Sequence, residues 1–171
     1  HEAGVPENVL QLIIGSGSTI GNALTQNNDI KGVIFTGSTS AAQLINRNLS
    51  NKNFDSILIA ETGGQNCMII DSTALIEHAV DDVILSAFGS AGQRCSALRM
   101  VYVQDDIADK FVEVLTGAMG ELEISKNLSA DVGEIIDEVA RKGLEEHIAE
   151  MKREAKLLYA CSAQDAGNYV P

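Results

Sequence analysis

The stretch GVIFTGST, residues 32–39, shows how this chain is built. An apolar run at residues 32–36 meets a short turn of glycine and hydroxyl residues, and a helical pattern follows from residue 40 to residue 49. A strand that is apolar throughout is typical of a sheet covered on both faces. The next apolar run, residues 57–60, comes directly after that helix. The order strand, helix, strand predicts a parallel βαβ unit.

The same alternation continues on both sides of this unit. We expect a buried strand at residues 9–14, a helix at residues 19–27, and further strands at residues 68–70, 100–103 and 157–159. A long helix is expected to begin at the capping oxygens of Asp71, Ser72 and Thr73 and to end near Ala91. Further helices are expected at residues 107–119 and 137–153. The expected fold class is α/β, with parallel sheets and flanking helices.

Adjacent glycines at positions 63 and 64 separate two of these strands. We therefore expect a domain boundary there, with residues 1–62 in a first domain and residues 63–171 in a second. The chain begins without methionine, and its first residues, HEAGVP, read like the end of a helix already under way. We expect an internal segment of a longer protein, and these residues show no secretory signal.

Composition indicates a globular protein that carries a negative charge. Hydrophobic residues make up 45% of the 171 residues, and the formal net charge is −12, so the basic surface that nucleic-acid binding requires is absent from this segment. No apolar run approaches the ~20 residues that span a bilayer. The three cysteines lack Cys-x-x-Cys spacing, which argues against a disulfide framework and suits a reducing compartment.

Two glycine turns are candidates for nucleotide binding. Gly15 and Gly17, in the stretch GSGSTIG, lie between an expected strand and an expected helix, where a dinucleotide-binding turn belongs. The spacing differs by one residue from the usual fingerprint, so an ordinary turn is an alternative. Gly37-Ser38-Thr39 also opens a helix, and free N–H groups there favour phosphate. Helix capping by Ser38 or Thr39 is the alternative, and on these residues alone it is the better one.

Cys95 stands apart from the other two cysteines. A free cysteine is usually a small buried hydrophobic residue, and Cys67 and Cys161 fit that expectation. Cys95 instead follows Arg94 in a polar loop, outside the helical period. A nearby cation and free backbone N–H groups favour the thiolate, which is the reactive form.

Glu61 ends a buried strand directly before the two-glycine turn. An acid in that position is either a solvated strand end or a partly desolvated carboxylate suited to act as a general base. The histidines have no metal-ligand spacing, and His78 and His147 are expected on exposed helix faces. We find no metal site in the sequence.

Three motifs in order resemble those of the aldehyde dehydrogenase superfamily. They are FTGST at residues 35–39, ETGGQN at residues 61–66 and GQRC at residues 92–95. The stretches GVP, residues 4–6, and GEIID, residues 133–137, extend the resemblance over essentially the whole chain. Thr62 and Gln65 stand where most members have leucine and lysine. These departures resemble the proline-catabolic branch, the Δ1-pyrroline-5-carboxylate (glutamate semialdehyde) dehydrogenase part of bifunctional proline-utilisation proteins.

The resemblance implies a chemistry and assigns residues to it. Cys95 would attack the aldehyde, a hydride would pass to NAD to leave a thioester, and Glu61 would activate the water that hydrolyses it. Arg94 and Ser96 are expected to help bind the substrate carboxylate. NAD is expected at Gly15 and Gly17 (adenosine), at Thr36, Gly37, Ser38, Thr39 and Ala41 (pyrophosphate and its surroundings), and at Thr62 and Gly63 (nicotinamide). FAD would belong only to a separate proline dehydrogenase domain of a bifunctional parent.

The implied partner is a small aldehyde, L-glutamate 5-semialdehyde, and the implied parent protein is a cytoplasmic homo-oligomer whose peripheral association with the inner membrane is left open. The segment alone is expected to be inactive, because the family's oxyanion asparagine and its nicotinamide-ribose contacts lie outside it. Two alternatives stay open: an aldehyde dehydrogenase for a different aldehyde, and a non-catalytic nucleotide-binding module. The choice between NAD and NADP also stays open, although the resemblance favours NAD.

Overall fold

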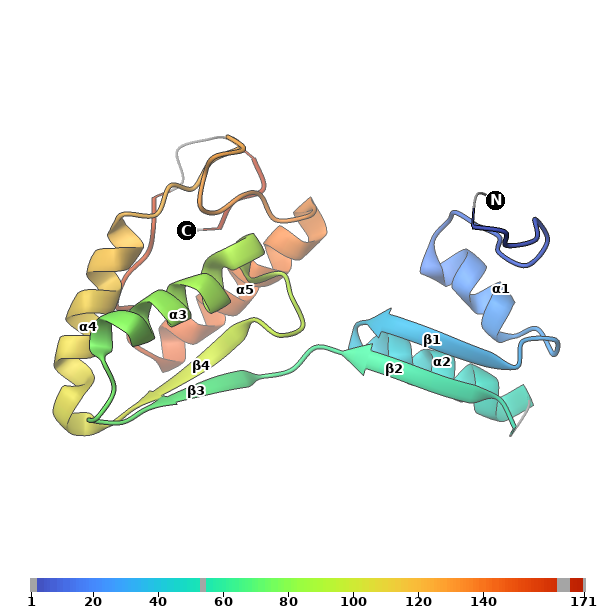
Figure 1. Ribbon diagram of the computed structural model, residues 1–171, viewed down its shortest axis with the longest axis horizontal. Coiled ribbons are helices and arrows are strands. Elements are labelled where there is room, and N and C mark those ends of the chain that lie inside the picture. Colours follow the sequence, from blue (N-terminus) through green and yellow to red (C-terminus); the bar gives the residue numbers. More distant parts are fainter. Residues whose placement is uncertain (1–2, 53–54, 163–166, 171) are drawn as a thin grey trace. The chain divides into compact units, whose positions relative to one another are not determined.

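The structure is a computed structural model that describes residues 3–52, 55–162 and 167–170 (Figure 1). The chain divides into two compact units, His1–Gly63 and Gly64–Pro171, and each is described by itself. This division lies one residue from the expected domain boundary. Both units combine helices with parallel strand pairs, which confirms the expected α/β fold class.

The first unit contains the expected βαβ element. Strand β1 (Gly32–Gly37) pairs in parallel with β2 (Ile57–Thr62), and α2 (Thr39–Lys52) connects them and covers one face of the sheet (Figure 1). The register places Thr36 opposite Glu61. Because both strands run in the same direction, the residues that follow them emerge at the same edge of the sheet.

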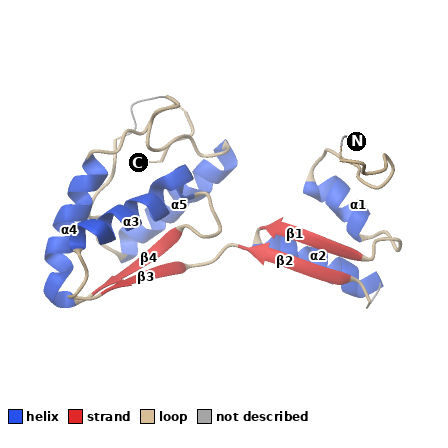
Figure 2. Ribbon diagram, viewed as in Figure 1, coloured by secondary structure: helices blue, strands red, loops and turns tan. Residues whose placement is uncertain are grey.

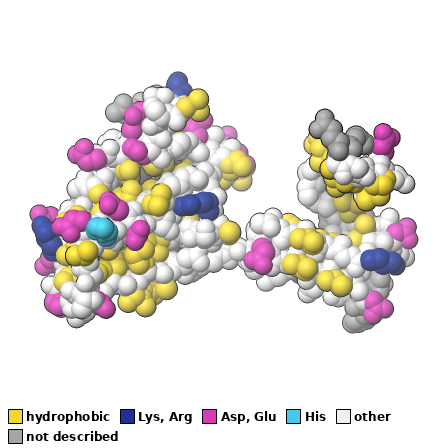
Figure 3. All heavy atoms as spheres, in the orientation of Figure 1, with side chains coloured by type: hydrophobic (Ala, Val, Ile, Leu, Met, Phe, Trp, Pro, Cys, Tyr) yellow, Lys and Arg dark blue, Asp and Glu magenta, His cyan; other side chains and the backbone are white. Residues whose placement is uncertain are grey.

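The other face of this sheet carries exposed apolar side chains. Ile34 is 84% exposed and lies opposite Ile59 in the strand pairing, and Ile57 is exposed on the same face. Figure 3 shows hydrophobic side chains over these two strands. The continuous apolar character of the strands is thus present, but within this unit α2 covers only one of the two faces.

A short helical segment precedes β1. A π-helical turn η1 (Gly17–Gly21) leads into α1 (Asn22–Thr25), which confirms a helix in the expected region. The helix ends at Thr25, before the expected end at residue 27. The side chain of Asn48 on α2 donates a hydrogen bond to the Thr25 hydroxyl at 2.9 Å. This contact joins α1 to α2.

The expected buried strand at residues 9–14 is wrong for this structure. The segment forms no strand, and its large side chains are exposed, with Leu12 at 86% and Ile14 at 84%. The backbone N–H of Val9 instead bonds the carbonyl of Pro6 in a turn. Composition favours a strand here, but a strand also needs a neighbouring strand to accept its hydrogen bonds, and in the part of the chain that the structure describes β1 pairs only with β2.

The second unit repeats the βαβ arrangement. Strand β3 (Asn66–Ile70) pairs in parallel with β4 (Leu98–Val103), and α3 (Ile76–Phe88) lies between them in sequence and along one face of the pair (Figure 2). Helix α4 (Asp105–Gly120) packs against α3. The core between these elements consists of Ile70, Ala79, Val80, Val83, Leu98 and Phe111.

The N-terminus of α3 differs from the expectation. The helix begins after Leu75, whose side chain makes no capping bond. Asp71 instead accepts hydrogen bonds from the backbone N–H of Thr73 at 2.8 Å and from its hydroxyl at 2.6 Å. Aspartate closes such local turns as readily as it caps helices. In place of the expected helix cap, Asp71 therefore closes a turn between β3 and α3. At its other end α3 stops at Phe88, before the expected Ala91.

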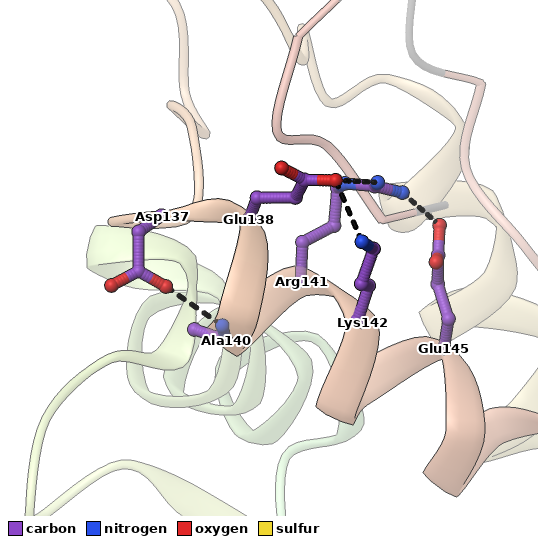
Figure 4. Close-up of polar contacts among 6 residues, drawn as sticks. All are labelled: Asp137, Glu138, Ala140, Arg141, Lys142 and Glu145. Carbon is purple, nitrogen blue, oxygen red and sulfur yellow. Dashed lines mark hydrogen bonds and ion pairs between the residues drawn. The ribbon is translucent and has the colours of Figure 1, made fainter.

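Helix α5 (Glu138–Glu154) begins where expected. The Asp137 carboxylate accepts a hydrogen bond from the backbone N–H of Ala140 at 2.7 Å, as an N-cap does. Glu138 and Lys142 form an ion pair at 2.8 Å. Figure 4 shows this cap together with the ion pairs on the helix surface, which are Glu138–Lys142, Glu138–Arg141 and Arg141–Glu145.

The closing strand expected at residues 157–159 is wrong, because this segment is irregular and pairs with no strand among the described residues. A smaller apolar cluster lies near it, formed by Ile124, Val132, Cys161 and Tyr169. No helix in the described part of the chain has both the length and the apolar character needed to cross a membrane.

Candidate active site

The loop that carries Cys95 lies between α3 and β4 and begins with an unusual backbone. A 3₁₀ turn, η2 (Gly89–Gly92), contains Ser90 with φ of 56° and Ala91 with φ of 52°, and Gly92 follows with φ of 64°. Residues other than glycine adopt positive φ only at an energetic cost. Two such residues in succession, Ser90 and Ala91, indicate that contacts around the loop hold it in this conformation.

Glycine is required at position 92. A Cβ atom there would lie 2.7 Å from the carbonyl oxygen of Ala87, in addition to the strain of the positive φ. The Gly92 carbonyl also accepts a hydrogen bond from Arg99 Nη2 at 2.6 Å. The close approach between this loop and the end of α3 therefore depends on glycine having no side chain at position 92.

Arg94 binds the C-terminal end of α3. Its Nη2 donates to the carbonyl oxygens of Leu85 at 3.0 Å and Ser86 at 3.2 Å. A cation in this position stabilises the negative end of the helix dipole and satisfies carbonyls that lack helical partners. Arg94 thus fixes the residue before Cys95, and its expected contact with a substrate carboxylate stays a prediction.

Gln93 joins the loop to a distant segment. Its Oε1 accepts a hydrogen bond from the backbone N–H of Ile136 at 2.8 Å. Its Nε2 donates to the carbonyl oxygens of Ser90 at 3.2 Å and Glu134 at 3.3 Å. Both the oxygen and the nitrogen of the Gln93 amide therefore form hydrogen bonds. Those to Ile136 and Glu134 hold the loop against the residues before α5.

Asn66, at the start of β3, holds the loop from the other side. Its Nδ2 donates to the carbonyl oxygens of Cys95 at 2.8 Å and Ala97 at 3.0 Å. The backbone N–H of Ala97 also bonds the carbonyl of Arg94 at 3.2 Å, so Cys95 lies within a tight turn. The sequence motifs predicted no role for Asn66, Gln93 or Arg99, although all three are polar residues within or beside those motifs.

The three cysteines differ in exposure. Cys95 is exposed, as expected of a reactive thiol, and Cys161 is buried. Burial raises the pKa of the Cys161 thiol above its ordinary value of 9.0, which keeps this sulfur protonated and unreactive. The expectation that Cys67 is buried is wrong, because only one face of the β3–β4 pair is covered by α3 within this unit.

Glu61 lies near the end of β2 in the first unit, and its side chain is exposed. Of the two alternatives for this residue, the solvated strand end agrees with its exposure. Cys95 belongs to the second unit. An approach of the Glu61 carboxylate to the Cys95 sulfur therefore stays a prediction.

The expected cofactor residues gather at the ends of strands and the starts of helices in the first unit. Ser38 caps α2, with its Oγ accepting from the backbone N–H of Ala41 at 3.2 Å, which confirms the capping alternative. A cavity of about 630 Å³ between η1, β1 and α2 is lined by Gly17 and Ala41. Outside its lining lie Gly15, Thr36, Gly37, Ser38, Thr39, Thr62 and Gly63.

His78 and His147 are exposed on helices, as expected. Within the described ranges, no three His, Cys, Asp or Glu side chains are grouped to hold a metal ion.

The aldehyde dehydrogenase family model matches residues 1–171. The chain belongs to the aldehyde dehydrogenase family. Among curated aldehyde dehydrogenase relatives, it is 47% identical to the bifunctional protein PutA of Escherichia coli K12 over 92% of the chain, and 44% identical to that of Klebsiella aerogenes over 99%. The chain spans only 12% and 14% of the length of these two proteins.

A solved structure of a PutA variant from Bradyrhizobium japonicum gives the same result in three dimensions. It is 51% identical to this chain and superposes with a TM-score of 0.94, covering 99% of this chain and 18% of that one. The aldehyde dehydrogenase segment described here is therefore similar to PutA in both sequence and fold.

Proposed function

We propose that this chain is part of an NAD-dependent dehydrogenase that oxidises L-glutamate 5-semialdehyde to glutamate in proline catabolism. The observation that carries the proposal is an exposed thiol, Cys95, on a loop held by four polar side chains, in a chain 44–47% identical to PutA proteins. Nucleophilic cysteines need this combination of access and fixed position. A buried structural cysteine needs neither.

The first unit has features that fit a dinucleotide. The cavity of about 630 Å³ has a largely apolar wall, including Phe35, Leu44 and Ile45, and a Cβ added at Gly17 on its rim would meet no atom within 4 Å. Apolar walls suit a planar base, and helix α2 presents its N-terminal N–H groups after Gly37, where phosphate oxygens are stabilised. Gly15, Gly17, Thr36, Gly37, Ser38, Thr39 and Ala41 would hold the adenosine and pyrophosphate, and Thr62 and Gly63 the nicotinamide.

The first chemical step belongs to Cys95. Its sulfur forms a bond to the aldehyde carbon, and the carbonyl electron pair moves to oxygen, where the Cys95 backbone N–H would donate a hydrogen bond. NAD, when bound, supplies the acceptor for the hydride that leaves this carbon. Loss of the hydride converts the carbon on Cys95 from a thiohemiacetal to a thioester.

The second step belongs to Glu61. Its carboxylate takes a proton from water, the water oxygen bonds the thioester carbon, and the carbon–sulfur bond breaks to release the carboxylic acid and the Cys95 thiolate. Because Glu61 is exposed at the end of its strand, it has room to reach a water molecule. Arg94 and Ser96 flank Cys95 and are the proposed contacts for the α-carboxylate of the substrate.

Cys67 provides a matched control for testing this proposal, because it is also an exposed cysteine in the second unit. In the full-length protein, Cys95→Ser should lower kcat for NADH formation from glutamate semialdehyde by at least about 1,000-fold, since serine is a far weaker nucleophile near neutral pH. Cys67→Ser should leave kcat within about twofold of the wild-type value, as surface changes usually do. Wild-type turnover by Cys95→Ser would refute the proposal.

A further inference from the structure

Asn66 is the first residue of β3, and its side chain binds the loop of Cys95. One amide nitrogen donates two hydrogen bonds, to the carbonyl of Cys95 at 2.8 Å and to that of Ala97 at 3.0 Å. We propose that Asn66 is a positioning residue that fixes the backbone of Cys95 and thereby the direction of its thiol. This inference rests on the proposed function of Cys95. Asn66 itself touches neither the thiol nor the proposed substrate.

The strand pairing explains how Asn66 reaches the loop. Asn66 pairs with Leu98, but Cys67 pairs with Met100, so the register shifts between these two positions of β3. The extra residue of this irregularity is Arg99 in β4, and β-bulges are common beside active sites. Asn66 keeps its pairing with Leu98, which places its side chain beside the loop that precedes β4, where it bonds main-chain oxygens.

The loop is held to a rigid base on this side. Ala97 is fully buried and Leu98 belongs to the core formed by α3, α4 and the strands. Asn66 therefore bridges a fixed residue, Ala97, and the reactive one, Cys95, across the tight turn that begins at Arg94. With the Cys95 carbonyl fixed, its peptide plane and the Cα–Cβ direction have little freedom.

The amide group is specifically suited to this task. Both partners are carbonyl oxygens, which accept hydrogen bonds only, and the Asn66 Nδ2 group carries two N–H donors. Aspartate has the same shape but would direct an oxygen at these two carbonyls. Alanine would remove the bonds without adding repulsion. These two substitutions therefore separate the role of the donors from the role of side-chain volume.

The test uses the full-length protein with Asn66→Asp and Asn66→Ala. We expect kcat to fall about 100-fold for Asn66→Asp and about 10-fold for Asn66→Ala, because small displacements of a nucleophile are costly. The KM for NAD should stay within about twofold, because the proposed cofactor residues all belong to the first unit. Alkylation of Cys95 by iodoacetamide near pH 7.5, followed by peptide mass spectrometry, should slow in both variants.

A structural control comes from Asn48, which donates from its amide to the Thr25 hydroxyl and Asn22 Oδ1 in the first unit. Asn48→Asp should lower Tm without changing the alkylation rate of Cys95. Wild-type kcat and alkylation in both Asn66 variants, while Cys95→Ser is inactive, would overturn this inference alone. An unaltered alkylation rate with a lowered Tm in Asn66→Ala would also overturn it. Activity in Cys95→Ser would instead overturn the proposed function.

Discussion

The Gln93 side chain accepts a hydrogen bond from the backbone N–H of Ile136, at 2.8 Å and across 43 positions of sequence. The same side chain donates to the carbonyl of Glu134. Two separate motifs, GQRC at residues 92–95 and GEIID at residues 133–137, are therefore in direct contact. The contact gives the second stretch a physical role, because it supports the loop that carries Cys95.

The first prediction concerns this amide. Gln93→Met keeps the length of the side chain but removes its hydrogen bonds to Ile136, Glu134 and Ser90. We expect a loss of about 1–2 kcal/mol in unfolding free energy, given the usual value of such bonds. We also expect kcat to fall by about 10-fold, because the Cys95 loop becomes less ordered. Thermal unfolding and steady-state kinetics of the full-length protein measure the two effects.

Gln104→Met is the matched control for Gln93→Met. Gln104 also accepts a hydrogen bond from a backbone N–H in the second unit, that of Ser72, at 3.0 Å, but it lies at the other end of the sheet from Cys95. It should lose stability without losing kcat. Equal kcat in the two variants would show that Gln93 supports the fold and not the nucleophile.

The second prediction concerns Gly92. Gly92→Ala places a methyl group 2.7 Å from the carbonyl oxygen of Ala87 at a backbone φ of 64°. We expect destabilisation by at least about 2 kcal/mol, from the backbone strain together with the clash. Gly143→Ala in α5 is the control, because its added Cβ would meet no atom within 4 Å and alanine favours a helix by about 1 kcal/mol. A higher Tm in Gly143→Ala beside an unchanged Tm in Gly92→Ala would contradict the described loop.

The third prediction concerns pH. Hydrogen bonds from the Thr73 hydroxyl and backbone N–H lower the pKa of the Asp71 carboxyl from its ordinary value of 3.8. An acid whose pKa is lower in the folded state contributes stability above its ordinary pKa, and that contribution is lost as pH falls through the folded-state value. Thr73→Val removes the hydroxyl, which is the larger cause. The pKa of Asp71, measured by carbon NMR titration, should move upward toward 3.8. A pKa that is the same in both proteins would argue against the turn.

Much of the fold was predictable because it depends on local patterns. The runs at residues 32–36 and 57–60 are mostly apolar and are separated by one stretch with a helical pattern, and they form β1 and β2 as expected. The segment at residues 9–14 is also mostly apolar but forms no strand. Composition indicates whether a segment favours extended structure, whereas strand pairing depends on whether another strand is available beside it.

The exposure of Cys95 was predictable from the sequence, but the contacts that support its loop were not. Cys95 was identified because it is a cysteine outside any helical or strand period, and the exposed thiol agrees with that reading. Asn66 and Gln93 were missed as supports because their partners lie 29 to 43 positions away in the sequence. Such contacts follow from how β3, β4 and the segment before α5 come together, and no local pattern records them.

Glu61→Gln in the full-length protein tests the central claim most directly. Glutarate semialdehyde is the suitable substrate, because it lacks the amine with which a glutamyl thioester could cyclise. If Cys95 forms a thioester that Glu61 hydrolyses, rapid mixing with NAD should show a burst of about one NADH per site, followed by turnover slowed at least about 100-fold. Cys95→Ser should show no burst. A steady-state rate in Glu61→Gln equal to that of the wild type, or a burst that persists in Cys95→Ser, would contradict the account.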